Sequence, residues 1–166
     1  MNEIRFAIRF LEMVKRRQEV RGTYHDAIVI DDFAHHPRAV QLTVDTVRAR
    51  YPGKKTVVVI EPNSATARSA IFQNEFAESL LGAAHVILAR PARPTSVPGV
   101  GDLDCAKIAD FLKQRGREAE VVSTLTDLRP AIDRAISHDA LLLILSNGTC
   151  LGLWESDFVE ELKRPI

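Results

Sequence analysis

Short, continuous apolar runs alternate with helical stretches along this chain, and this alternation limits the folds open to it. Five runs predict strands, at residues 27–30, 56–60, 85–89, 120–122 and 140–145. A strand with one face in water would alternate in polarity, so these runs indicate a sheet buried on both faces. Helices are predicted from Pro37, through Phe76 and Ile108, and at 127–137 and 155–163. The sequence therefore predicts an α/β fold: a Rossmann-like, doubly wound, mainly parallel sheet flanked by helices.

The length of the chain limits the number of domains. Its 166 residues, 46% of them hydrophobic, are enough for one packed domain and few for two. Apolar residues recur at helical spacing from Ile4 to Val14, which predicts an amphipathic helix at the start. The apolar stripe of this helix needs a partner surface, so we expect an N-terminal extension followed by one globular domain.

Charge and cysteine content argue against several classes of protein. The 22 basic and 22 acidic residues cancel, so no basic field is available to bind nucleic acid. Cys105 and Cys150 are far apart and lack neighbouring ligand clusters, which favours reduced, buried thiols over a disulfide or a zinc site. The apolar runs are too short for a signal peptide or a membrane span. We expect a cytoplasmic protein.

Four polar residues that could carry chemistry follow the first apolar run, namely Asp31, Asp32, His35 and His36. In a parallel sheet, this position lies at the carboxyl ends of the strands, where ligands bind. Such a cluster could bind a divalent metal, hold a nucleotide through its ribose hydroxyls, or only cap the next helix. The residues alone leave these three interpretations equally open.

Two further polar segments follow predicted strands. In segment 61–68, Ser64 and Thr66 could bind a ligand or cap a helix, and the guanidinium of Arg68 suits a carboxylate or a phosphate. Gly148, after Ser146 and Asn147, permits a tight turn. The sequence has no GxGxxG or GxxxxGK[ST] pattern. If ATP is used, its triphosphate must therefore be held by a part of the protein outside this sequence.

The run from Asp31 to Pro37 resembles the DDxxHHP signature that begins the C-terminal domain of Mur ligases, which act on UDP-N-acetylmuramate. Three more motifs agree with the family in order: residues 14–19, Glu61-Pro62-x-Ser64-x-Thr66, and Ser146-Asn147-Gly148. The pattern is most similar to the peptidoglycan-recycling branch, which uses L-alanyl-γ-D-glutamyl-meso-diaminopimelate. The L-alanine-adding branch shares the HHP run but has a His-Arg-rich stretch at the positions of residues 63–65.

The resemblance implies an ATP-dependent amide ligase of peptidoglycan synthesis or recycling with three domains. ATP and Mg²⁺ would be bound mainly by a central domain outside this sequence. ATP would convert a carboxylate to an acyl phosphate, so that UDP-N-acetylmuramate is joined to an amino acid or peptide. Residues 1–22 would be the terminal helix and linker of the central domain, and residues 23–166 the C-terminal domain. We expect this fragment to be inactive alone.

The resemblance also assigns roles to individual residues. Arg17 and Asp32 would contact the nucleotide, Asp32 through the ribose hydroxyls. His35 would lie beside the nucleotide and the incoming amine, as the catalytic residue. The substrate pocket would be lined by Ser64, Thr66, Arg68, Ser146 and Asn147. No residue is assigned to a metal. Considered without the resemblance, the cationic cluster Lys15-Arg16-Arg17 complements a helix dipole as readily as it binds phosphate, and a solvated face is the default interpretation.

The chain departs from the recycling branch at three places. Asn63 and Ala65 replace Arg and Asn, and residues 149–151 replace a glycine-rich run. The peptide specificity therefore stays open, and an L-alanine-adding ligase is the alternative. Two hypotheses from other classes are a stand-alone binding module without catalysis and a metal-dependent hydrolase that uses the Asp/His cluster.

Overall fold

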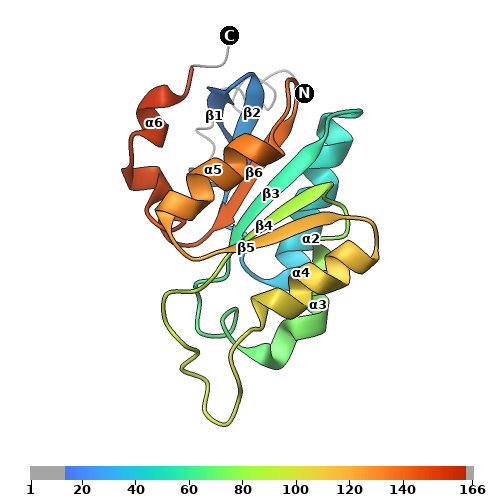
Figure 1. Cartoon of the computed structure of the whole chain (residues 1–166), viewed down its shortest axis with the longest axis vertical. Coiled ribbons are helices and arrows are strands. Elements are labelled where there is room, and N and C mark those ends of the chain that lie inside the picture. Colours follow the sequence, from blue (N-terminus) through green and yellow to red (C-terminus); the bar gives the residue numbers. More distant parts are fainter. Residues whose placement is uncertain (1–13, 164–166) are drawn as a thin grey trace, which may run out of the picture.

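The computed structural model of the chain describes residues 14–163 and is shown in Figure 1. One six-stranded sheet runs through the molecule in the order β1-β2-β6-β3-β4-β5. The strands are β1 (Glu19–Tyr24), β2 (Ala27–Asp32), β3 (Thr56–Glu61), β4 (His85–Ala89), β5 (Glu118–Val122) and β6 (Leu141–Ser146). All neighbours pair in parallel except β1, which is antiparallel to β2. The five predicted strands and the mainly parallel sheet are confirmed.

Helices cover both faces of the sheet, as the doubly wound fold requires (Figure 1). One face carries α2 (Pro37–Arg50), the 3-10 turn η1 (Ala70–Phe72), α3 (Gln73–Ser79) and α4 (Cys105–Gln114). The other face carries α5 (Leu125–Ala135), η2 (Leu153–Glu155) and α6 (Phe158–Glu161). Each face has its own apolar core, and every residue of the central strands β3 and β6 is buried. This burial on both sides explains why those strands are continuously apolar.

Two details of the secondary structure differ from the prediction. The strand β1 was missed because its sequence, EVRGTY, is polar and only half buried at the edge of the sheet. The helix predicted at 155–163 is interrupted, because Ser156 adopts an extended backbone between η2 and α6. Edge strands and broken helices lack the strong periodicity on which such predictions rest.

The start of the domain also needs a correction. The strand β1 begins at Glu19, and its pairing with β2 starts at the Glu19–Asp31 pair. The expected boundary between residues 22 and 23 therefore cuts through a strand, and residues 19–22 belong to the sheet. The helix predicted at residues 1–14 lies, except for Val14, outside the described residues.

The two cysteines lie in the separate cores on opposite faces of the sheet. Cys105 is 3% exposed and Cys150 is fully buried, and both are free thiols. Burial raises the pKa of Cys105 to about 11 and the pKa of Cys150 well above its ordinary value. Both thiols are therefore protonated and unreactive at neutral pH. No helix between residues 14 and 163 is long and apolar enough to cross a membrane.

Gly22 offers a direct test of this packing. It lies at a bulge in β1 with φ of 146°, and an added Cβ would collide with the backbone carbonyl oxygen of Lys163. We expect Gly22→Ala to lower the free energy of unfolding by about 1–3 kcal/mol, because both conformation and space are unsuitable. Gly101→Ala, where a Cβ would meet nothing within 4 Å, is the matched control. Equal urea midpoints for the two variants would contradict the structure.

Candidate functional site

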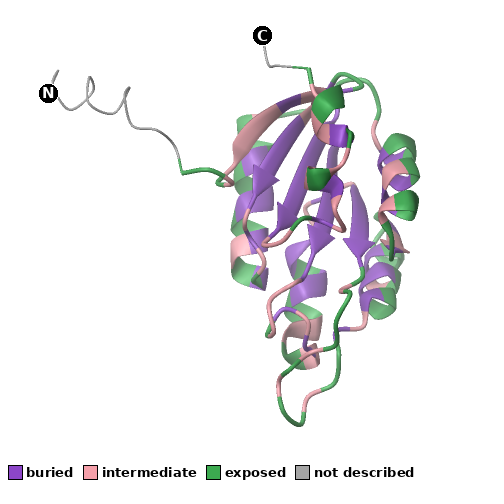
Figure 2. Ribbon diagram, turned by 90° about the vertical axis from the view of Figure 1, so that its left-hand side faces the viewer, coloured by how far each residue is buried: buried purple, intermediate pink, exposed green. Residues whose placement is uncertain are grey.

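The polar motifs found in the sequence meet at the carboxyl edge of the sheet, the edge where β2, β3 and β6 end. Because β6 lies between β2 and β3, Asp32 pairs with Leu145 and Glu61 pairs with Ser146 at the ends of these strands. The loop after β4 projects beyond the same edge, to which the strand arrowheads point in Figure 2. Segments separated by more than 80 residues are thus neighbours at this edge.

Arg17 and Asp32 line the same hollow, of about 500 Å³, together with Gln18 and residues of α2 from Ala39 to Arg50. Asp32 is 4% exposed, and its two carboxylate oxygens accept hydrogen bonds from the backbone N–H of Gln18 (2.8 Å) and of Ala34 (2.7 Å). The guanidinium of Arg17 is exposed and lies 5.3 Å from the centre of the Phe33 ring. A fixed carboxylate beside a solvent-facing cation suits a ribose and its phosphates.

His35 lies in an adjacent hollow of about 400 Å³, with Ser64, Thr66 and Phe72 among its lining residues. Its Nδ1 is 2.9 Å from the carbonyl oxygen of Phe33. A carbonyl can only accept, so Nδ1 carries the hydrogen and Nε2 of the neutral ring is left to accept one. Ser64 Oγ accepts from the Ala67 N–H (3.2 Å) within the turn, whereas the next helical elements, η1 and α3, have no side-chain cap.

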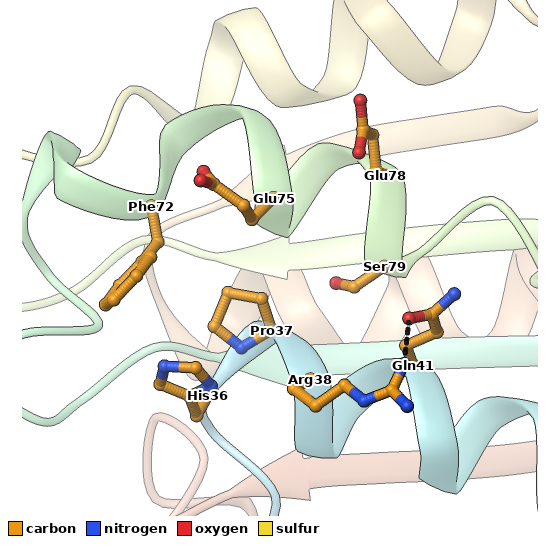
Figure 3. Close-up of a pocket in the computed structure, with 8 residues that line it drawn as sticks. All are labelled: His36, Pro37, Arg38, Gln41, Phe72, Glu75, Glu78 and Ser79. Carbon is orange, nitrogen blue, oxygen red and sulfur yellow. Dashed lines mark hydrogen bonds between the residues drawn. The ribbon is translucent and has the colours of Figure 1, made fainter.

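His36 also lines a third hollow, of about 230 Å³, between α2 and α3 (Figure 3). Its ring packs edge-on against Phe72, with ring centroids 4.8 Å apart. Glu75 and Glu78 of α3 line this hollow opposite Arg38 of α2. His36 therefore borders both this hollow and the hollow that contains His35.

The Asp/His cluster does not converge on one point. Asp31 faces Arg16 and Arg21, whereas Asp32 binds backbone N–H groups. Within residues 14–163 no group of three or more His, Cys, Asp or Glu side chains is placed to hold a metal ion. Side chains alternate along a strand, and neighbouring residues therefore face different surroundings. This arrangement gives no support to the metal interpretation of the cluster.

Arg16 is part of the site, although its sequence context indicated only a solvated cation. Its Nη2 donates to the carbonyl oxygens of Ser146 (2.6 Å) and Gly148 (3.0 Å), and its Nε is 3.3 Å from an oxygen of Asp31. Its own carbonyl accepts from the Phe33 N–H (2.9 Å). Arg16 thus links the loop after β2 to the turn after β6, a role that only the tertiary structure reveals.

Glu61 organises the turn that follows β6. Its buried carboxylate accepts hydrogen bonds from the Ser146 hydroxyl (2.7 Å) and from the N–H groups of Cys150 and Leu151 (3.1 Å each). Ser146 Oγ also accepts from the Gly148 N–H (2.9 Å). The fully buried Ser146 hydroxyl therefore supports the turn, and does not line any of the hollows described above.

The turn itself explains two features of the sequence. A Cβ on Gly148 would collide with the side-chain amide of Asn63 and lie 3.0 Å from the carboxylate of Glu61, so any larger residue here needs the Asn63 side chain to move. Cys150 and Leu151 have φ values of 56° and 53°, in the left-handed region that favours glycine. These are the positions where the chain lacks the glycine-rich run, and Glu61 stabilises the resulting conformation.

Arg68 lies on the far side of the Ser64–Ser69 turn, in a separate hollow of about 280 Å³ formed with the loop after β4. One guanidinium nitrogen donates to the carbonyl oxygen of Asn63 (2.9 Å). Its Nε is buried and has no hydrogen-bond partner in the described part of the chain. The predicted substrate residues are therefore divided: Ser64 and Thr66 lie near His35, Arg68 faces another hollow, and Ser146 lies beneath the surface.

Residues 16–148 match the family described as "Mur ligase, glutamate ligase domain". The chain belongs to this family. The UDP-N-acetylmuramate–L-alanine ligase of Lachnospira eligens is 31% identical over 151 residues, which cover 89% of this chain and 32% of that protein. The chain spans about a third of the length of such curated relatives.

Two solved structures of the family are similar to this Mur ligase domain. The murein peptide ligase of Psychrobacter arcticus has a TM-score of 0.73 at 26% identity, over 97% of this chain and 32% of that one. The UDP-N-acetylmuramate–alanine ligase of Thermotoga maritima has a TM-score of 0.64 at 27% identity, over 89% and 30% of the two chains. The family resemblance of the motifs is thereby confirmed, and both branches of the family are represented among the relatives.

Asp31 gives the Mur ligase domain a stability that depends on pH. Burial raises the pKa of its carboxyl above the ordinary value of 3.8, although Arg16 and Arg21 oppose the shift. The folded protein therefore binds this proton more tightly than the unfolded chain, and the stability contribution is lost as pH rises through the raised pKa. We expect the free energy of unfolding, relative to Asp31→Asn, to fall from pH 3.5 upward. Denaturant titrations at several pH values will measure it, and the opposite slope would refute the assignment.

Glu61 should be important for the stability of the domain. In Glu61→Gln, an amide NH₂ replaces an oxygen that accepts hydrogen bonds, so we expect a loss of about 1.5–3 kcal/mol in the free energy of unfolding. Glu75→Gln, on the exposed side of α3, should cost less than about 0.5 kcal/mol. Chemical denaturation will measure the free energy of unfolding of both variants. Equal losses in the two variants would contradict the prediction.

Proposed function

We propose that this chain is the C-terminal domain of an ATP-dependent ligase that joins UDP-N-acetylmuramate to an amino acid or peptide through an acyl phosphate. The arrangement of two adjacent hollows carries this proposal. One contains Arg17 and Asp32, and the other contains His35, Ser64 and Thr66. A nucleotide and an incoming amine could therefore be held side by side at the carboxyl edge of the sheet.

The first hollow would receive part of the ATP. Hydrogen bonds from two backbone N–H groups fix the orientation of the Asp32 carboxylate. Its remaining lone pairs would accept hydrogen bonds from the ribose hydroxyls. Ala34, Ala39 and Leu42 give the hollow an apolar wall. The sequence contains no phosphate-binding glycine loop, and the curated relatives are about three times as long. We therefore propose that another domain holds the triphosphate with its Mg²⁺.

The second hollow would receive the amine. The amine must lose a proton when it attacks the acyl phosphate, and Nε2 of His35 is the available acceptor. Ser64 and Thr66 would position the acceptor substrate. The chemistry needs no protein nucleophile, because holding the two reactants together and excluding water accounts for much of the acceleration.

For the acceptor, we propose L-alanyl-γ-D-glutamyl-meso-diaminopimelate, with L-alanine as the alternative. The motif pattern and the similarity to a murein peptide ligase support the peptide. The curated L-alanine ligases support the alternative. The decisive experiment is to assay the complete polypeptide that contains this domain with ATP, Mg²⁺ and UDP-N-acetylmuramate, and to compare kcat/KM for the two acceptors. The isolated chain should release no ADP, and turnover by it would refute the proposal.

His35 provides the mutational test. In the complete ligase, we expect His35→Ala to lower kcat about 100-fold, because a proton acceptor is removed. The exposed His138, which precedes β6 at the opposite edge of the sheet, supplies the control variant His138→Ala. A loss of less than three-fold in His35→Ala, or an equal loss in the control, would exclude a catalytic role for His35.

A further inference from the structure

The aromatic ring of Phe33 contacts two residues that have proposed roles in the reaction. The guanidinium of Arg17 lies over this ring, 5.3 Å from its centre. The imidazole of His35 is nearly perpendicular to the ring, with the two centroids 5.4 Å apart. Arg17 lines the proposed nucleotide hollow and His35 the proposed amine hollow, whereas Phe33 lines neither of them. One side chain thus contacts groups proposed to act on two different reactants.

The Phe33 ring does not serve core packing. It is half-buried, and within residues 14–163 it belongs to neither of the two apolar cores. A second guanidinium, that of Arg16, lies 5.5 Å from the centre of the ring. The face of an aromatic ring carries partial negative charge and attracts guanidinium groups, whereas an aliphatic side chain of similar size has no such face. The aromatic character of Phe33 is therefore used by its charged and polar neighbours.

The backbone of Phe33 is held on both sides, whereas the Arg17 side chain is not. The Phe33 N–H donates to the carbonyl oxygen of Arg16 (2.9 Å), and the Phe33 carbonyl accepts from Nδ1 of His35 (2.9 Å). Arg17 is exposed, and among residues 14–163 its guanidinium forms no hydrogen bond and no salt bridge. A long, exposed side chain samples many rotamers unless a contact restricts it. The Phe33 ring supplies such a contact from a fixed position.

We infer that Phe33 is a positioning residue that holds Arg17 toward the nucleotide and His35 toward the amine. This inference rests on the proposed function and adds to it the group that aligns the two hollows. A guanidinium that is already held over the ring loses less freedom when it binds phosphate, so nucleotide affinity rises. An imidazole held against the ring keeps its proton acceptor Nε2 in one direction, which raises the rate. Phe33 acts through these two neighbours and touches neither reactant.

Steady-state kinetics of the complete ligase will test the inference. We expect Phe33→Leu to raise KM for ATP about five-fold and to lower kcat about five-fold, because both ring contacts are lost while similar bulk remains. Phe33→Tyr keeps the aromatic face and should stay within about two-fold of the wild type in both constants. A loss of stability alone would reduce the amount of active enzyme and leave KM unchanged. Phe111→Leu, which removes a half-buried ring from Arg115 at the end of α4, is the matched control and should not change KM for ATP.

A double-mutant cycle shows whether Phe33 acts through Arg17. We expect Arg17→Gln to raise KM for ATP at least about five-fold in the otherwise wild-type ligase, but less than about two-fold in the Phe33→Leu background. Equal effects in the two backgrounds, or a Phe33→Tyr variant as impaired as Phe33→Leu, would overturn the inference and leave the proposed function intact. An unchanged KM for ATP in the single variant Arg17→Gln would refute the proposed nucleotide hollow, and the inference with it.

Discussion

Buried carboxylates at the ends of β2 and β3 determine how the carboxyl edge of this domain is built. An ionised carboxylate away from water is costly unless hydrogen bonds or opposite charges compensate it. Backbone N–H groups bind Asp32, and the turn after β6 binds Glu61. Arg16 and Arg21 offset the burial of Asp31 in part. The partners of these three carboxylates come from different loops. The segment before β1, the loop after β2 and the turn after β6 are thus held together.

This framework borders three hollows at the carboxyl edge of the sheet. The proposed nucleotide hollow is lined by Asp32, a second hollow by His35, and a third by Arg68, Arg90 and Arg93 on the far side of the Ser64–Ser69 turn. Arg16 joins the first of these to the turn after β6, while Glu61 supports that turn from below. The polar residues that support the framework are therefore largely distinct from those proposed to contact substrates. A substitution at Glu61 should change stability first, whereas one at His35 should change the rate.

The fold was predictable because its strands are buried on both faces and read as continuous apolar runs. The edge strand β1 was not predictable, because a half-buried polar strand has no continuous apolar run. Within the site, the motifs predicted that Asp32, His35 and Ser64 lie at the carboxyl edge of the sheet. They did not reveal that Ser146 is buried beneath its turn, that Arg68 lies apart from Thr66, or that Arg16 is a structural link. Those facts depend on which way each side chain points.

The sequence by itself determined the alternation of strands and helices, the edge at which the polar motifs gather, and the family, because these follow from local periodicity and short motifs. Only the tertiary structure decided which polar groups share a hollow. Glu61 and Ser146 are 85 residues apart along the chain but 2.7 Å apart in space, because parallel pairing of β3 with β6 aligns their ends. Arg90 and Arg93 meet Arg68 for a similar reason, since hydrogen bonds fasten one loop to the other.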